Sequence, residues 1–242
     1  MRAEARPAFY ALERGGWRDY VTLLHVPYTA WHLSYAVIGC ALAPTLHTER
    51  LLATVAAFFL ALGIAAHALD ELHGRPLGTA IPGRVLAVLA VVSLAGAVAI
   101  GVVAALAWTP WLLALIAVGA FLVPAYNLEL FGRRFHSDLW FGLAWGAFPL
   151  LTGYVVTAER VDPEALLGGV AALLLSLAQR QLSTQVRTVR RRVERVEGTI
   201  EYRDGSTGRI SAATLLRAPE LALRALTFAT IAFAAALVAT HL

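Results

Sequence analysis

Lysine is missing from this chain, and cysteine is nearly so. All 20 basic residues are arginine, and the single cysteine, Cys40, lies inside a long apolar stretch. Without a second cysteine, the chain forms no internal disulfide and no Cys-x-x-Cys metal site. Without lysine, it has neither a Schiff-base nucleophile nor the lysine of a phosphate-binding P-loop. These absences exclude several classes of enzyme chemistry.

Charged residues of both signs are also scarce. Only 15% of the residues are charged, 59% are hydrophobic, and the mean hydropathy is +0.67. A helix needs about 20 apolar residues to cross the hydrocarbon core, and the apolar runs here are too long for barrel strands. The sequence therefore predicts an all-α, polytopic membrane helix bundle of about seven transmembrane helices, which forms a single integral membrane domain over residues 1–242. The predicted spans lie near residues 20–43, 50–69, 85–106, 108–126, 138–157, 164–182 and 219–240.

The ionisable residues gather in alternate gaps between these spans. Arginines precede the first span and fill the gaps after the second, fourth and sixth spans, whereas only Arg50 and Arg160 lie in the other gaps. The positive-inside rule then predicts a multi-pass protein with a cytoplasmic N-terminal arm over residues 1–19 and an outside C-terminus. Concentrated at one membrane face, this basic charge favours membrane lipids or a phosphorylated substrate as partners, and not nucleic acid.

The longest polar stretch, residues 183–218, is expected on the same cytoplasmic face. Valines recur in it at helical spacing, which predicts a short amphipathic helix; they are Val186, Val189, Val193 and Val196. The turn residues Asp204 and Gly205 then predict a small hairpin over Thr199–Ile210, and Ser211 is suited to cap the last helix. Two interpretations stay open for this stretch: a connecting loop with basic anchors, or a lid over a functional site.

The strongest cluster of chemically active side chains ends the second span. His67, Asp70 and Glu71 are expected on one helix face, because positions three and four apart are neighbours, and His73 follows closely. An imidazole and two carboxylates this close can bind a divalent cation. The alternative is a solvated turn in which Arg75 pairs with one of the carboxylates.

Two further clusters lie elsewhere along the chain. Between the fourth and fifth spans stand Tyr126, Asn127, Glu129, Arg133, Arg134, His136 and Asp138. Two adjacent arginines can neutralise a phosphate group, although a short inside loop also calls for them. In the fifth span an aromatic stripe follows at helical steps, through Phe141, Trp145, Phe148 and Thr152. In the first span one face carries His25, Tyr28, Thr29, His32 and Tyr35, which indicates a pocket or a hydrogen-bonded core.

This pattern resembles the UbiA-type intramembrane prenyltransferase superfamily over about residues 20–190. That family carries Asn-Asp-x-x-Asp-x-x-x-Asp after its second helix, and the corresponding stretch here reads AHALDELHGRPLG. Asp70 matches the second aspartate, whereas His67 and Gly74 stand at the first and third. Tyr126 and the glycine-rich stretch 141–154 also fit the family. The family's second motif, Asp-x-x-x-Asp, has no counterpart in AQRQLSTQVRTVRR, and the family usually has nine helices.

The resemblance implies a UbiA-like enzyme that joins an isoprenoid diphosphate to a lipophilic acceptor at the cytoplasmic membrane face. It further implies Mg²⁺ bound between carboxylates and the diphosphate. The metal ligands and catalytic residues would be Asp70, Glu71 and His67, with His73 beside them. The substrate would be bound by Arg75, Arg133, Arg134, Gln185 and Arg187, and the pocket lined by Tyr126, Asn127, His25 and His32.

Two other functions stay open. The set of histidines and carboxylates also suits iron, copper or zinc, which would make the chain an oxidase or hydroxylase on a lipid substrate, or a haem-binding protein. The third possibility is a non-catalytic lipid-binding or transport protein on the same fold. The sequence specifies no oligomeric state.

Overall fold

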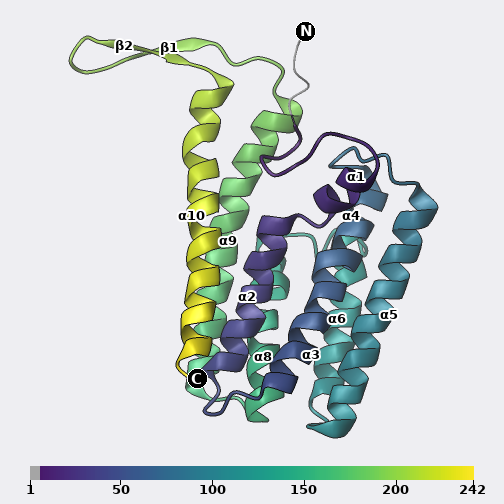
Figure 1. Ribbon diagram of the computed structural model, residues 1–242. Helices are drawn as coiled ribbons and strands as arrows, with labels where there is room; N and C mark the ends of the chain where they lie inside the picture. The colour runs from purple at the N-terminus through teal and green to yellow at the C-terminus, as the bar shows by residue number, and fades with distance from the viewer. Residues whose placement is uncertain (1–5) are drawn as a thin grey trace.

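Helices run side by side along one common axis and form an all-α bundle, with one small β-hairpin projecting from one end (Figure 1). The structure is a computed structural model and describes residues 6–242, so residues 1–5 of the predicted arm, with Arg2, lie outside the described part. The elements are α1 (Trp17–Leu23), α2 (Val26–Leu42), α3 (Thr48–Phe58), the π-helix η1 (Phe59–Ala66), α4 (His67–Gly74), α5 (Gly83–Ala107), α6 (Leu112–Asn127), α7 (Asp138–Phe141), the π-helix η2 (Gly142–Ala147), α8 (Phe148–Ala158), α9 (Pro163–Arg192), β1 (Gly198–Glu201), β2 (Thr207–Ile210) and α10 (Ala212–Ala239).

In the described part of the chain, 5 helices are long and apolar enough to cross a membrane. They are α3 with η1 and α4, α5, α7 with η2 and α8, α9, and α10. The prediction of an all-α membrane bundle is therefore confirmed. The remaining two predicted spans correspond to α2 and α6, which have 17 and 16 residues. Both are shorter than the roughly 20 residues of a full crossing, so the number of seven spans stays a prediction.

The first predicted span is interrupted near its start. His25 adopts a left-handed conformation with φ of 46°, and it separates α1 from α2. Proline is tolerated in the first turn of a helix but not in its interior, because its ring removes a donor and clashes with the preceding turn. Pro27 is the second residue of α2, so the helix restarts there. The break places the His25 side chain at the end of the bundle.

Glycines allow α2 and α8 to cross at very short range. A Cβ atom added at Gly39 would lie 2.0 Å from the Leu150 carbonyl oxygen, and one added at Gly153 would lie 2.3 Å from that of Ala36. Glycine in the predicted glycine-rich helix thus allows α8 to pack closely against α2. On its other side α2 packs against α10, which itself lies against α9 (Figure 1).

The Arg-rich stretch differs in part from its prediction. The separate amphipathic helix is wrong: α9 continues without a break to Arg192, because no glycine or proline interrupts residues 170–192. Val186 and Val189 are buried on this extension. The hairpin is confirmed, with Gly198 paired to Ile210 and Glu201 to Thr207. Ser211 caps α10 and accepts a hydrogen bond from the Thr214 amide. The hairpin points away from the bundle (Figure 1).

Candidate functional site

A polar cavity of about 620 Å³ occupies the hairpin end of the bundle. Its walls come from α2, from α4, from the end of α6 and its connection to α7, from α7 and η2, from the end of α9, and from residues 7–10. All three predicted clusters therefore meet in one place. The predicted site residues that line this polar cavity are His25, His32, His67, Asp70, His73, Asn127, Arg133 and Arg187.

Asp70 is a carboxylate without a partner in this cavity. It makes no hydrogen bond and no ion pair within residues 6–242, although Arg187 and Arg191 are near enough to act on its charge. One turn earlier on the same helix, His67 donates from Nδ1 to the Gly63 carbonyl oxygen at 3.1 Å. The His67 ring lies 4.1 Å from the His25 ring, centroid to centroid. Asp70 is consequently free to accept a cation or a hydrogen-bond donor from a ligand.

Glu71 and Arg75 correct the prediction, because the side chains of both bind the loop that follows α4. The fully buried Glu71 carboxylate accepts the Leu77 amide at 2.9 Å, the Thr79 amide at 2.8 Å and the Thr79 hydroxyl at 2.9 Å. Arg75 donates to the Ile81 carbonyl at 2.6 Å. Neither residue lines the polar cavity. The expectation that Glu71 faces the same site as Asp70 is therefore wrong, and so is the alternative of an Arg75–carboxylate pair.

The connection between α6 and α7 supplies an ion-pair network to the cavity. Oxygens of Glu129 lie 3.3 Å from the Arg133 guanidinium, 3.8 Å from His73 Nε2 and 3.7 Å from His136 Nε2. Both adjacent arginines are exposed, but Arg133 lines the cavity and Arg134 does not. The sequence therefore predicted correctly that this connection contributes to the site, but it did not show that only the first of the two adjacent arginines lines the cavity.

Tyr126 lies behind the cavity wall and acts through Arg180. Its hydroxyl accepts a hydrogen bond from the Arg180 guanidinium at 2.7 Å, and Arg180 also pairs with Asp138 at 2.8 Å. This network joins the end of α6 to α7 and α9. Tyr126 is therefore a positioning residue for the cavity, whereas Arg180 and Asp138 line it directly.

The end of α9 forms an arginine wall that the sequence reading found only in part. Arg180, Arg187, Arg191 and Arg192 all line the cavity. Among the described residues, Arg187 donates hydrogen bonds only within its own helix, to the Ser183 carbonyl at 3.3 Å and the Thr184 hydroxyl at 3.1 Å. The predicted ligand Gln185 is exposed on another face and outside the lining. Steps of seven and four residues from Arg180 to Arg187 and Arg191 keep one helix face, and that spacing was the missed signal.

Several cavity histidines have a defined tautomer. Nδ1 of His32 lies 2.7 Å from the Trp145 carbonyl oxygen, and Nδ1 of His136 lies 3.0 Å from that of Tyr126. Because a carbonyl oxygen only accepts, each Nδ1 carries the proton and donates, as His67 does to Gly63. In the neutral ring Nε2 is then an acceptor. Nε2 of His25 is buried and has no hydrogen-bond partner among the described residues.

The structure does not preassemble the predicted metal set. Within residues 6–242 no three histidine, cysteine or carboxylate side chains come close enough to hold a metal ion together. His67 and Asp70 share the cavity with His73, while Glu71 is engaged elsewhere. Any cation at this site would therefore need ligands from a bound molecule as well.

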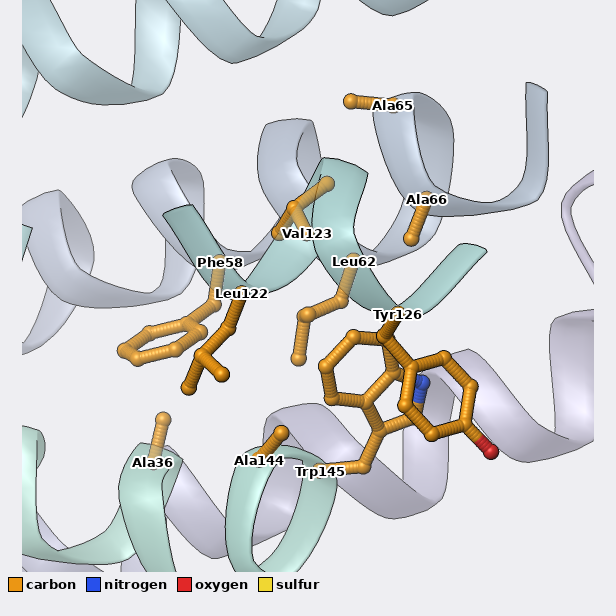
Figure 2. Close-up of a cluster of buried hydrophobic side chains, with 10 residues drawn as sticks. All are labelled: Ala36, Phe58, Leu62, Ala65, Ala66, Leu122, Val123, Tyr126, Ala144 and Trp145. Atoms are coloured by element: carbon orange, nitrogen blue, oxygen red, sulfur yellow. The ribbon is translucent and has the colours of Figure 1, made fainter. Parts of the chain in front are cut away.

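A second, apolar cavity of about 100 Å³ lies deeper in the bundle, between α3, η1, α5, α6, η2 and α8. Trp145 lines both cavities, and its ring stands 4.8 Å from the ring of Tyr126. Figure 2 shows these two rings side by side in a buried cluster with Phe58, Leu62 and Leu122. The aromatic stripe follows this order: Phe141 lines the polar cavity, and Phe148 and Thr152 line the apolar one.

The fold and this site define a helical membrane protein with a polar cavity at one end and an apolar cavity beneath it. No protein-family model matches the chain, and neither a curated protein nor a solved structure is detectably similar to it. The resemblance to the UbiA-type superfamily therefore stays a prediction.

Proposed function

We propose that this chain is a prenyltransferase-like membrane enzyme, which transfers an isoprenoid chain from a diphosphate to a lipophilic acceptor. The diphosphate occupies the polar cavity, at the cytoplasmic face, and the isoprenoid chain extends toward the apolar cavity. The N-terminal side of the bundle is then cytoplasmic and the C-terminus lies outside. The observation that carries the proposal is the arginine wall facing the unpartnered carboxylate of Asp70.

The charge balance of the polar cavity favours an anion. Five arginines line it against three carboxylates, and two of these carboxylates already have partners, because Glu129 pairs with Arg133 and Asp138 with Arg180. Arg187 and Arg191 have no carboxylate partner within residues 6–242. Guanidinium groups bind phosphate oxygens through charge-assisted hydrogen bonds, often two at a time. The site thus offers cationic donors that protein groups do not neutralise.

Asp70 fits the magnesium ion that the family resemblance implies. Mg²⁺ is commonly bound by one or two carboxylates together with substrate phosphates, and it keeps several waters. Asp70 supplies one such carboxylate, and the diphosphate would supply the remaining oxygens. When bound, the ion would neutralise charge on the leaving diphosphate. Only one carboxylate is available in this way, so the arginine wall would carry much of the neutralisation.

The adjoining apolar cavity explains why an isoprenoid chain suits the site. Its lining is almost entirely apolar, with Leu62, Leu94 and Ile116 among the side chains that contribute. Trp145 lines both cavities, and the Phe141 ring, which lines the polar cavity, lies 6.4 Å from the Trp145 ring. Aromatic ring faces attract a cation within about 6 Å of the ring centroid, which matches the allylic cation formed as the carbon–oxygen bond breaks.

In the proposed reaction the bond between the first isoprenoid carbon and the diphosphate oxygen breaks heterolytically. The electron pair leaves with the diphosphate, where the arginines stabilise the added negative charge. An electron pair of the acceptor forms the new bond to the allylic carbon, and the acceptor then loses a proton. The protein's own groups bind and orient both reactants and exclude water.

The test measures binding of farnesyl diphosphate, and release of diphosphate, with Mg²⁺ and the protein in lipid nanodiscs. Arg187→Gln should weaken binding by tenfold or more, because a charge-assisted hydrogen bond is lost. Asp70→Asn should abolish the dependence of diphosphate release on Mg²⁺. The matched control is Arg134→Gln, which removes an exposed arginine outside the cavity and should change neither quantity. Equal behaviour of all three variants and the unmodified protein contradicts the proposal.

A metalloenzyme is the second candidate, and the histidine geometry favours it. A histidine that ligates a metal through one ring nitrogen usually donates from the other to a carbonyl or carboxylate, as His32 and His67 do here. Elemental analysis of the purified protein tests it: near-stoichiometric iron, copper or zinc that His67→Ala removes would favour this function. A non-catalytic lipid binder or transporter would bind farnesyl diphosphate without releasing diphosphate.

A further inference from the structure

Residues Arg6–Gly16, which we call the N-terminal strap, precede α1 and form part of the wall of the polar cavity. The strap contains no helix or strand, yet Pro7, Ala8, Phe9 and Tyr10 line the cavity. Ala8 and Ala11 are buried. The strap therefore forms part of the cavity wall, beside the space that a ligand would occupy.

Two aromatic side chains hold the strap inside the cavity. The Phe9 ring lies 6.3 Å from the Tyr28 ring and 5.0 Å from the Arg224 guanidinium carbon. The Tyr10 ring lies 5.4 Å from the His25 ring and 5.5 Å from that of Tyr28. Burial raises the pKa of Tyr10 far above its ordinary value, so its hydroxyl stays protonated. These contacts place the strap directly against the histidine side of the cavity.

The backbone of the strap is bound by two arginines at the end of α9, one of which, Arg191, belongs to the arginine wall. Arg191 donates from Nε to the Pro7 carbonyl at 3.1 Å, and Arg190 donates to the Arg6 carbonyl at 3.3 Å. Arg190 also pairs with Glu220 of α10, whereas Arg191 lines the cavity and has no carboxylate partner among the described residues. Arg191 thus has two competing roles, in holding the strap and in binding an anion.

The far end of the strap is tied down independently of the arginines. The Leu12 amide donates to the Thr22 hydroxyl, and the Gly15 amide to the Asp19 carboxylate, both at 3.0 Å. Asp19 also accepts the Ala80 amide at 2.9 Å. Gly15 has φ of 115°, a conformation that glycine adopts without strain. The strap therefore has a fixed end at α1 and a cavity end held by Arg191.

We infer that the N-terminal strap is a gate, which an anionic ligand opens by taking Arg191 away from the Pro7 carbonyl. The guanidinium donates to both acceptors, but a phosphate oxygen carries negative charge and adds charge–charge attraction that the neutral Pro7 carbonyl lacks, so a diphosphate outcompetes the carbonyl. The same exchange reduces the affinity for the anion, because binding must first release Tyr10 and Phe9. This inference rests on the proposed function in one respect, namely that the cavity binds a diphosphate.

Hydrogen–deuterium exchange of the full chain in nanodiscs, with and without inorganic pyrophosphate, tests the gate. Pyrophosphate should increase exchange of the strap amides while α2 is unchanged. Without any ligand, Arg191→Gln should already raise exchange in the strap. Its matched control, Arg195→Gln, removes an exposed arginine whose partner is Glu197 and should leave the strap as it is. In the full chain, Tyr10→Ala should strengthen pyrophosphate binding about tenfold, within the usual range of coupling between sites.

The outcomes separate the two proposals. Pyrophosphate that binds but leaves strap exchange unchanged, or lowers it, overturns the gate and leaves the proposed function standing. Pyrophosphate that does not bind even to Tyr10→Ala overturns the diphosphate site, and the gate with it. Binding that Arg191→Gln weakens, together with faster strap exchange in that variant, supports both.

Discussion

Replacing Glu71 by alanine should destabilise the whole bundle, although Glu71 lies one residue from the proposed site. Its carboxylate accepts the amides of Leu77 and Thr79 in a fully buried setting. Each amide left unpaired costs about 1–3 kcal/mol, so the two together cost about 2–6 kcal/mol. For a chain of this size a loss of 1 kcal/mol lowers Tm by about 2–4 °C, which predicts a fall of about 10 °C. Glu71→Gln keeps one acceptor oxygen and should lose about half as much.

The measurement is thermal unfolding of the purified protein in one detergent, combined with pyrophosphate binding by the surviving folded fraction. Asp70→Asn is the matched control, because it removes a carboxylate from the preceding position of the same helix, where no partner within residues 6–242 is left unpaired. Its Tm should stay within about 2 °C of that of the unmodified protein. The reasoning is refuted if Glu71→Ala leaves Tm unchanged, or if Glu71→Gln removes Mg²⁺-dependent ligand binding as strongly as Asp70→Asn.

Two further changes test the packing of the bundle and an ion pair at the N-terminal end of α3. Gly39→Ala places a Cβ atom 2.0 Å from a carbonyl oxygen of α8 and should lower Tm by several degrees, whereas Gly74→Ala, with nothing within 4 Å of the new Cβ, should not. Arg50→Leu removes a largely buried guanidinium that pairs with Glu159 at 2.8 Å, so thermal unfolding should again shift downward. The exposed pair of Arg195 gives the comparison, since such surface pairs contribute about 0–1 kcal/mol and Arg195→Leu should leave Tm nearly unchanged.

Hydropathy and turn residues predicted much of the fold. The long apolar runs became helices, and Asp204-Gly205 closed the expected hairpin, because glycine readily takes the positive φ of 80° that the turn requires. The predicted end of the sixth span was wrong, because the polar residues after it do not stop the helix. Although α9 carries arginine and threonine there, it continues to Arg192. Charge alone does not end a helix, whereas near the start of the first span Pro27 accompanies the break at His25.

The sequence predicted which segments of the chain form the candidate site better than it predicted which residues line it. The clusters of ionisable residues correctly indicated which segments of the chain line the polar cavity. Such groups are costly near the end of a membrane helix unless they share a hydrated space. Helical spacing failed for Glu71, because a following loop with free amides competes for any nearby carboxylate. Nothing in the sequence indicated that Tyr10 lines the cavity, because it lies outside any helix or strand and so has no helical spacing to the other site residues. A strap without secondary structure reaches its position through long-range contacts such as Arg191 with Pro7, and these are not encoded in local spacing.

The two π-helices explain part of this difference between local pattern and final geometry. A π-helix has wider turns than an α-helix, so it shifts the side chains after it relative to an α-helical count, and such segments frequently occur at functional sites. Here η1 directly precedes His67 and Asp70, and η2 contains Trp145. Backbone carbonyls of both segments accept hydrogen bonds from histidine, Gly63 from His67 and Trp145 from His32. The π-helices thus orient both rings toward one cavity, and an α-helical reading of the sequence contains no sign of either segment.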